Sequence, residues 1–148
     1  MQDNFQTDDL DKRILTALAV DSRRSYADVA SEVGMSTAAV HERVRKMVDR
    51  GVIERFSIKV APEALGLHLT AFVAIRNDGG THCRDIADRL RELPEVVEVH
   101  SVAGEHDSLV KVRCVHARAL EDVLYAIKAI PGVLRTTSTV VLNTEFER

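Results

Sequence analysis

The chain has 148 residues, of which 45% are hydrophobic and 29% are charged, and its formal net charge is −3 at pH 7. This composition is typical of a globular protein and excludes a largely disordered one. No run approaches the ~20 apolar residues that cross a bilayer, and the acidic stretch Met1 to Asp11 does not resemble an export signal, so we expect a cytoplasmic protein without a membrane partner.

The positive charge is concentrated in one short segment. Residues 1–60 contain ten Lys and Arg and ten Asp and Glu, whereas residues 61–148 contain ten against thirteen. Within the first part, residues 41–59 hold six basic and three acidic residues. Because nucleic-acid binding depends on where charge lies more than on its sum, this segment is the candidate for such a contact.

Residues 1–60 are predicted to form a helical domain. Apolar residues recur at helical spacing over residues 10–18, behind an acidic start that suits a helix N-terminus. Two more helices are predicted over residues 25–34 and 36–50, because each begins at a serine that can cap it and ends at a glycine. A three-residue turn containing glycine joins them, which is the helix-turn-helix spacing. The alternating stretch 52–60 is predicted to be a linking strand.

The third of these helices has two distinct faces. Val40, Val44 and Met47 form an apolar stripe, and small and charged residues lie on the other side. A solvated charged surface would be the ordinary interpretation of an isolated helix, but small residues at its start also permit close approach to a DNA major groove. The predicted DNA-binding residues are Ser36, Thr37, Ala38, His41, Glu42, Arg45 and Lys46.

Residues 61–148 are predicted to form a second domain with a βαββαβ repeat. A proline-containing connector precedes two strand-helix-strand units, and each helix ends in a segment with proline followed by a β-rich run. Such a ferredoxin-like unit places two helices on one face of a four-stranded antiparallel sheet, which gives the whole chain an α+β fold. The predicted strands are 69–75, 96–102, 109–115 and 133–142, and the predicted helices are 83–93 and 119–130.

The other face of this sheet is predicted to be open. The strand 109–115 alternates Val110, Val112 and Cys114 with Leu109, Lys111 and Arg113, which is apolar enough to favour pairing with a second copy. We therefore expect a homodimer or a larger even-numbered assembly.

The chain resembles the Lrp/AsnC family of transcriptional regulators, also called feast/famine regulators. The resemblance covers roughly Leu10 to Leu142 and depends on the order and spacing of short pieces rather than on any one of them. These pieces are Leu10-Asp11 with Ile14-Leu15, Val33 to Ser36, Glu42 to Met47 with Gly51 and Ile53, Gly104 to Asp107, and Pro131 to Val133 with Thr136 and Ser138.

The resemblance implies a winged-helix-like DNA-binding domain followed by a domain that dimerises, often assembles further to octamers, and binds an amino acid or related effector between C-terminal domains. It implies no cofactor. The effector residues that it indicates are Gly104, His106, Asp107, Thr136 and Ser138, with Asp107 suited to a ligand ammonium. His106 and Ser138 replace the usual aromatic residue and threonine, which leaves the effector's identity open.

Two other functions compete with a DNA-binding regulator. A haem-pathway decarboxylase of the same two-domain architecture could use His100, His106 and Arg113, although this leaves the small and cationic surface of the third helix unexplained. A ligand-sensing assembly protein without DNA binding is favoured by Glu42 and Asp49. The six histidines lack metal-ligand spacing, and Cys83 and Cys114 lack a CxxC spacing, so we expect neither a metal site nor a disulfide.

Overall fold

The computed structural model describes residues 6–147. Between Lys59 and Val60 the chain divides into two compact units, one helical and one built on a β-sheet. Each unit has its own cluster of buried apolar side chains. No helix in the described part of the chain is long and apolar enough to cross a membrane.

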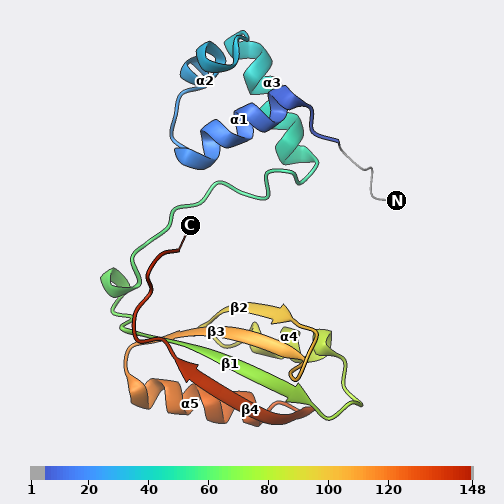
Figure 1. Cartoon of the computed structure of the whole chain (residues 1–148), viewed down its shortest axis with the longest axis vertical. Helices are drawn as coiled ribbons and strands as arrows, with labels where there is room; N and C mark the ends of the chain where they lie inside the picture. The colour runs from blue at the N-terminus through green and yellow to red at the C-terminus, as the bar shows by residue number, and fades with distance from the viewer. Residues whose placement is uncertain (1–5, 148) are drawn as a thin grey trace. The chain divides into compact units, whose positions relative to one another are not determined.

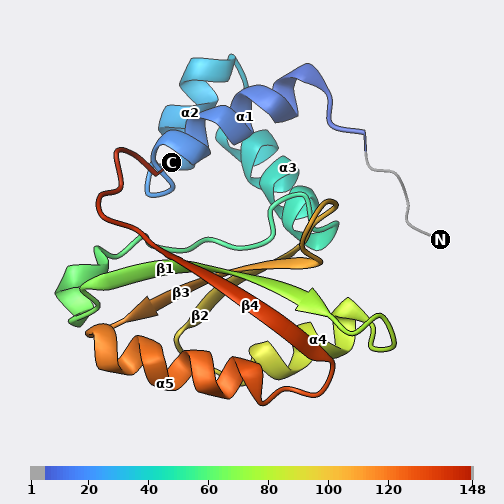
Figure 2. The same ribbon diagram turned by 60° about the horizontal axis from the view of Figure 1, so that its bottom comes forward.

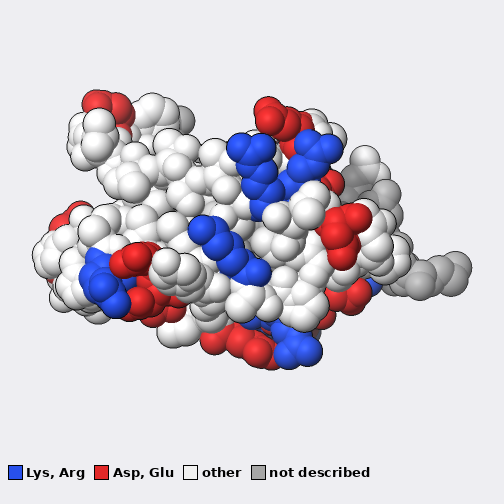
Figure 3. Space-filling view, turned by 90° about the horizontal axis from the view of Figure 1, so that it is seen from below, with Lys and Arg blue, Asp and Glu red and all other residues white. Residues whose placement is uncertain are grey.

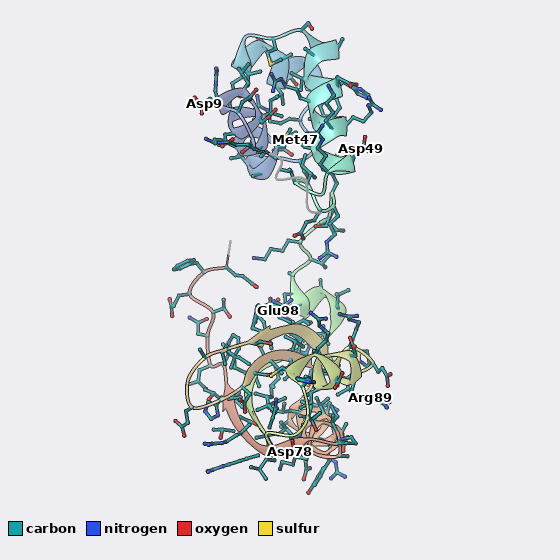
Figure 4. The ribbon with its side chains drawn as sticks, turned by 90° about the vertical axis from the view of Figure 1, so that its right-hand side faces the viewer. Asp9, Met47, Asp49, Asp78, Arg89 and Glu98 are labelled. Carbon is teal, nitrogen blue, oxygen red and sulfur yellow. The ribbon has the colours of Figure 1, made fainter. Side chains whose placement is uncertain are left out.

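The helical unit consists of α1 (Asp9–Val20), α2 (Tyr26–Val33) and α3 (Thr37–Asp49), as Figure 1 shows. The three helices pack their apolar sides together, and Figure 4 shows Met47 directed among them while Asp49 points away. The buried side chains are Ile14, Ala17, Leu18, Val29, Ala30, Val33, Val40, Val44 and Met47.

The helix ends follow from local hydrogen bonding. The Ser25 hydroxyl oxygen accepts a bond from the backbone N–H of Asp28 at 3.1 Å, and that of Ser36 accepts one from Ala39 at 3.2 Å. Gly34 ends α2 with φ of 74°, a conformation that favours glycine. The predicted helix-turn-helix is therefore confirmed.

The predicted linking strand over 52–60 is wrong. Residues 54–61 have no regular secondary structure, and the large apolar side chains of this segment are exposed, 50% for Phe56 and 84% for Ile58. Alternation of apolar and polar residues becomes a strand only where a second strand can pair with it. Among residues 6–59 there is no strand, and so no β wing.

The second unit is an antiparallel sheet with the strand order β2-β3-β1-β4. Figures 1 and 2 show its two helices on the same face of the sheet, which confirms the predicted ferredoxin-like α+β fold. After a short 3-10 helix, Pro62–Leu65, the elements are β1 (Leu69–Asn77), α4 (Cys83–Leu90), β2 (Val96–Ser101), β3 (Ser108–Cys114), α5 (Ala117–Lys128) and β4 (Val133–Val140).

Helix boundaries in the second unit differ from the prediction, and α5 ends at Lys128 rather than at residue 130. Helix α4 ends at Leu90 rather than at residue 93, and turns lead from there to Pro94, whose ring disfavours helix in the residue before it. Helix α5 begins at Ala117, two residues early, because the His116 ring caps it: Nδ1 accepts a hydrogen bond from the backbone N–H of Ala119 at 3.1 Å. Histidine is not among the usual capping residues.

The two faces of the sheet differ in polarity. Val110, Val112 and Cys114 are buried in the core shared with α4 and α5. The open face instead carries Leu109, Lys111 and Arg113 from the same strand, so it is more polar than the sequence predicted. Both cysteines are free thiols, and burial raises the pKa of Cys114.

Candidate nucleic-acid and effector sites

The outer side of α3 presents small residues at its start and cations further along. Ser36, Thr37 and Ala38 are all exposed, and Arg45 has 58% of its side chain exposed. The small side chains of this first turn therefore allow a partner surface to approach the helix closely. A helix placed in a major groove contacts base edges with its N-terminal residues, so this arrangement is suited to DNA.

Glu42 holds both cations of this surface. Its carboxylate accepts hydrogen bonds from Nε and Nη2 of Arg45 at 3.1 and 2.8 Å, and Nζ of Lys46 lies 3.5 Å away. The bond from Arg45 lowers the pKa of Glu42, and Glu42 raises the pKa of Arg45. The pair orients the guanidinium along α3 and offsets part of its charge.

His41 is held at the junction of two helices. Its ring meets that of Tyr26 on α2 edge to face, with centroids 5.6 Å apart, while the residue itself remains exposed. This aromatic contact fixes the position of the imidazole beside the start of α3.

Asp107 lies at one end of the sheet, directly before β3, and is hydrogen-bonded to β1. Its backbone N–H donates to the carbonyl of Ile75 at 2.9 Å, and its carboxylate Oδ2 accepts from the backbone N–H of Asn77 at 2.8 Å. Gly104, with φ of 143°, lies in the exposed turn before it, and His106 is half-buried. The loop thus presents a partly buried carboxylate with its second oxygen available.

Thr136 and Ser138 lie on the other side of β1 from this loop. The register places Thr136 opposite Ile75 and Ser138 opposite Val73, so both belong to the face that carries the helices. Because β1 separates β4 from β3, two strand spacings, or about 9.5 Å, separate these hydroxyls from Asp107. One chain therefore does not bring the five predicted effector residues together.

The comparisons with known proteins agree for both units. The family model for the AsnC-type helix-turn-helix domain matches residues 8–48, and that for the Lrp/AsnC ligand binding domain matches residues 70–148. The chain belongs to the Lrp/AsnC family. It is 41% identical to the HTH-type transcriptional regulator LrpA of Mycobacterium tuberculosis over 97% of this chain and 95% of that protein.

Solved structures of Lrp/AsnC proteins share the fold of the whole chain. A feast or famine regulatory protein from M. tuberculosis complexed with L-methionine has a TM-score of 0.88 and 41% identity, and covers 95% of each chain. A transcriptional regulator from Neisseria meningitidis, also in complex with L-methionine, has a TM-score of 0.87 and 25% identity over 96% of this chain and 94% of that one.

The residues that a decarboxylase would use are not brought together in this Lrp/AsnC chain. His100 lies opposite Leu109, and Arg113 lies four residues further along β3, a separation of about 13 Å. His100 pairs with Glu98 at 3.3 Å, and Arg113 pairs with Glu147 at 3.2 Å.

Arg43 is a structural residue of α3 that the sequence did not indicate. Its guanidinium contacts the carboxylates of Asp8 and Asp11, at 2.7 Å each, and Asp11 is only 4% exposed. Asp8 and Asp11 also cap the start of α1 reciprocally. The Arg43 guanidinium therefore ties the start of α1 to α3. The acidic start of α1 could be recognised in the sequence, but the contact of Asp11 with Arg43, 32 residues later in the chain, could not.

The surface charge is mixed on the face that Figure 3 shows. Lys and Arg side chains lie beside Asp and Glu side chains, without a broad area of one sign. Because the formal net charge is −3, attraction to a polyanion depends on local groups of cations, such as those of α3.

Proposed function

We propose that the chain is a transcriptional regulator that binds double-stranded DNA through α3. The observation that carries this is the exposed start of α3, where small residues precede Arg45 on the same surface. Ser36 and the N-terminal backbone amides are placed for a phosphate, and Thr37 and Ala38 for base edges. His41, Arg45 and Lys46 extend the contact, with Glu42 orienting Arg45.

DNA binding is controlled by an amino acid or a related small effector in the C-terminal unit. The two related structures in complex with L-methionine support this class of ligand. Asp107 supplies the carboxylate for the ligand ammonium, and the turn with Gly104 and His106 supplies backbone donors. Because Thr136 and Ser138 lie on the far side of β1, they reach the ligand from another copy of the chain.

The chain works as a homodimer or a larger even-numbered assembly, such as an octamer. On the open face of the sheet, Phe72 is 37% exposed and Leu109 is half-buried. Lys111, which lies directly opposite Phe72 in the β1–β3 register, has 11% of its side chain exposed and pairs with Glu98 and Glu147. A face with an apolar centre and neutralised cations is suited to self-association.

A salt titration with genomic DNA fragments tests this function. Binding through phosphates must weaken steeply as salt increases, and selection of bound fragments should enrich particular sequences. Repeating the titration with single amino acids should shift the affinity for at least one. Amino-acid binding without DNA binding at low salt would instead favour a ligand-sensing assembly protein.

A further inference from the structure

Glu42 and Arg45 form a side-on pair on the exposed surface of α3. Nε and Nη2 of Arg45 donate to the two carboxylate oxygens of Glu42, at 3.1 and 2.8 Å. A guanidinium carries five N–H groups in one plane, and this pair uses one on Nε and one on Nη2. Two parallel N–H groups, one on Nη1 and one on Nη2, remain at the outer end of that plane, and no residue between 6 and 147 is hydrogen-bonded to them.

The pair lies on the same side of α3 as the small residues at its start. The helical repeat places Ala38, Glu42 and Arg45 on one side of the helix, where the Glu42 and Arg45 side chains are 45% and 58% exposed. Helical side chains lean toward the N-terminus, so the bond to Glu42 holds the guanidinium nearer to that end than its own backbone. The free end of the guanidinium is therefore available at the part of a recognition helix that contacts base edges.

The charges around Arg45 favour a neutral partner over a phosphate. The Glu42 carboxylate, 2.8 Å from Arg45 and 3.5 Å from Lys46, offsets one of their two positive charges. It also repels a phosphate, whereas the edge of a base carries no net charge. The two free N–H groups still require two acceptors side by side, and in the major groove guanine is the base that presents them, at N7 and O6.

We propose that Arg45 and Glu42 together read one G·C base pair in the major groove. Arg45 donates to N7 and O6 of guanine, and Glu42, which positions the guanidinium, accepts from the N4 amino group of the paired cytosine. The two side chains thus present donor, donor and acceptor to the acceptor, acceptor and donor of a G·C pair. An A·T pair would instead place the N6 amino group of adenine against a donor. This inference rests on the proposed DNA-binding function and adds to it the base pair that α3 selects.

Selection from a library of random duplexes by the full-length protein tests this reading. Wild-type protein should enrich sites with a fixed G·C pair. In Arg45→Lys, which keeps the charge but not the planar fork, the preference at that pair should be lost, while the rest of the site and the salt dependence stay the same. In Glu42→Gln the preference should fall severalfold. Glu121→Gln, which removes a carboxylate three residues from Arg118 on α5, is the matched control and should select the wild-type sequences.

Base analogues in the enriched duplex test the contact with guanine itself. 7-Deazaguanine lacks the N7 acceptor, so at the fixed guanine it should lower the affinity of the wild type about tenfold, as for the loss of a charge-assisted bond. The affinity of Arg45→Lys should not change with this analogue. Inosine keeps N7 and O6 and lacks only the minor-groove amino group, so it should bind like guanine.

The outcomes distinguish this inference from the proposed function. If Arg45→Lys selects the wild-type sequences, Arg45 contacts a phosphate, and the reading of a base pair is overturned while DNA binding through α3 stands. An unchanged preference in Glu42→Gln would overturn the joint reading by the two side chains. A wild-type site whose fixed positions are all A·T pairs would overturn it as well. Wild-type protein without salt-dependent binding to any duplex would refute both the inference and the proposed function.

Discussion

One chain provides all the residues of the proposed DNA site in the helical unit, but only part of the proposed effector site in the sheet unit. Every residue proposed to contact DNA lies on α3 or its cap, where helical spacing alone places them on one surface. The residues proposed to contact the effector lie on both sides of β1. A site on one helix depends on local structure, whereas this sheet site depends on register and on assembly.

The largest expected effect comes from breaking assembly. Phe72→Asp places a charge at the centre of the open face, and burying it against a second copy should cost about 3 kcal/mol or more of association free energy. Sedimentation of the full-length protein should show dissociation, and binding of the amino acid that the wild type binds in a panel should be lost with it. Tyr125→Asp, at a position 64% exposed on α5, is the control. Unchanged association of Phe72→Asp would contradict the open-face dimer.

Removing Arg43 should instead break the helical unit. Arg43→Ala leaves the buried Asp11 carboxylate without its cation, which should lower the free energy of unfolding by about 2 kcal/mol. The loss is smaller than for a fully buried ion pair because the guanidinium is partly exposed. Urea denaturation followed by circular dichroism measures it. Arg45→Ala on the same helix should leave the free energy of unfolding nearly unchanged, because its side chain is exposed. Equal stability of both variants would exclude the anchoring role of Arg43.

Asp107→Asn tests the effector anchor within the intact sheet. The amide can still accept the bond from Asn77 but no longer attracts an ammonium, so the amino acid that the wild type binds in a panel should bind about 2 kcal/mol more weakly, or about thirtyfold. Calorimetry gives the affinity, and DNA binding without effector should be unchanged. Asp88→Asn on the surface of α4 should bind like the wild type. An unaltered affinity in Asp107→Asn would refute its role.

Glu42→Gln should have the smallest effect, and it should be a gain. Loss of the carboxylate releases Arg45 and Lys46, so affinity for non-specific DNA should rise severalfold, with a steeper salt dependence. Fluorescence anisotropy with random duplexes measures this, and Glu121→Gln on α5 is the control. Weaker binding would show that Glu42 itself makes a favourable contact with DNA.

The same contrast explains what could be predicted from the sequence. Serine caps and glycine stops are local signals, and they predicted the ends of α2 and α3. The segment 52–60 has the alternation of a strand but finds no partner among residues 6–59, so the local pattern was misleading there. The separation of Asp107 from Thr136 and the contact of Arg43 with Asp11 both depend on register or tertiary packing, which no local pattern contains.

The most direct test of the central claim is the DNA affinity of Arg45→Ala at several salt concentrations. We expect a loss of about 1–3 kcal/mol on a selected fragment if Arg45 reads a base, or a uniform loss with a shallower salt dependence if it contacts a phosphate. Arg118→Ala, at an exposed position on α5, should bind as the wild type does, and self-association should be intact in both variants. DNA affinity and salt dependence identical to the wild type in Arg45→Ala would contradict the assignment of α3 as the recognition helix.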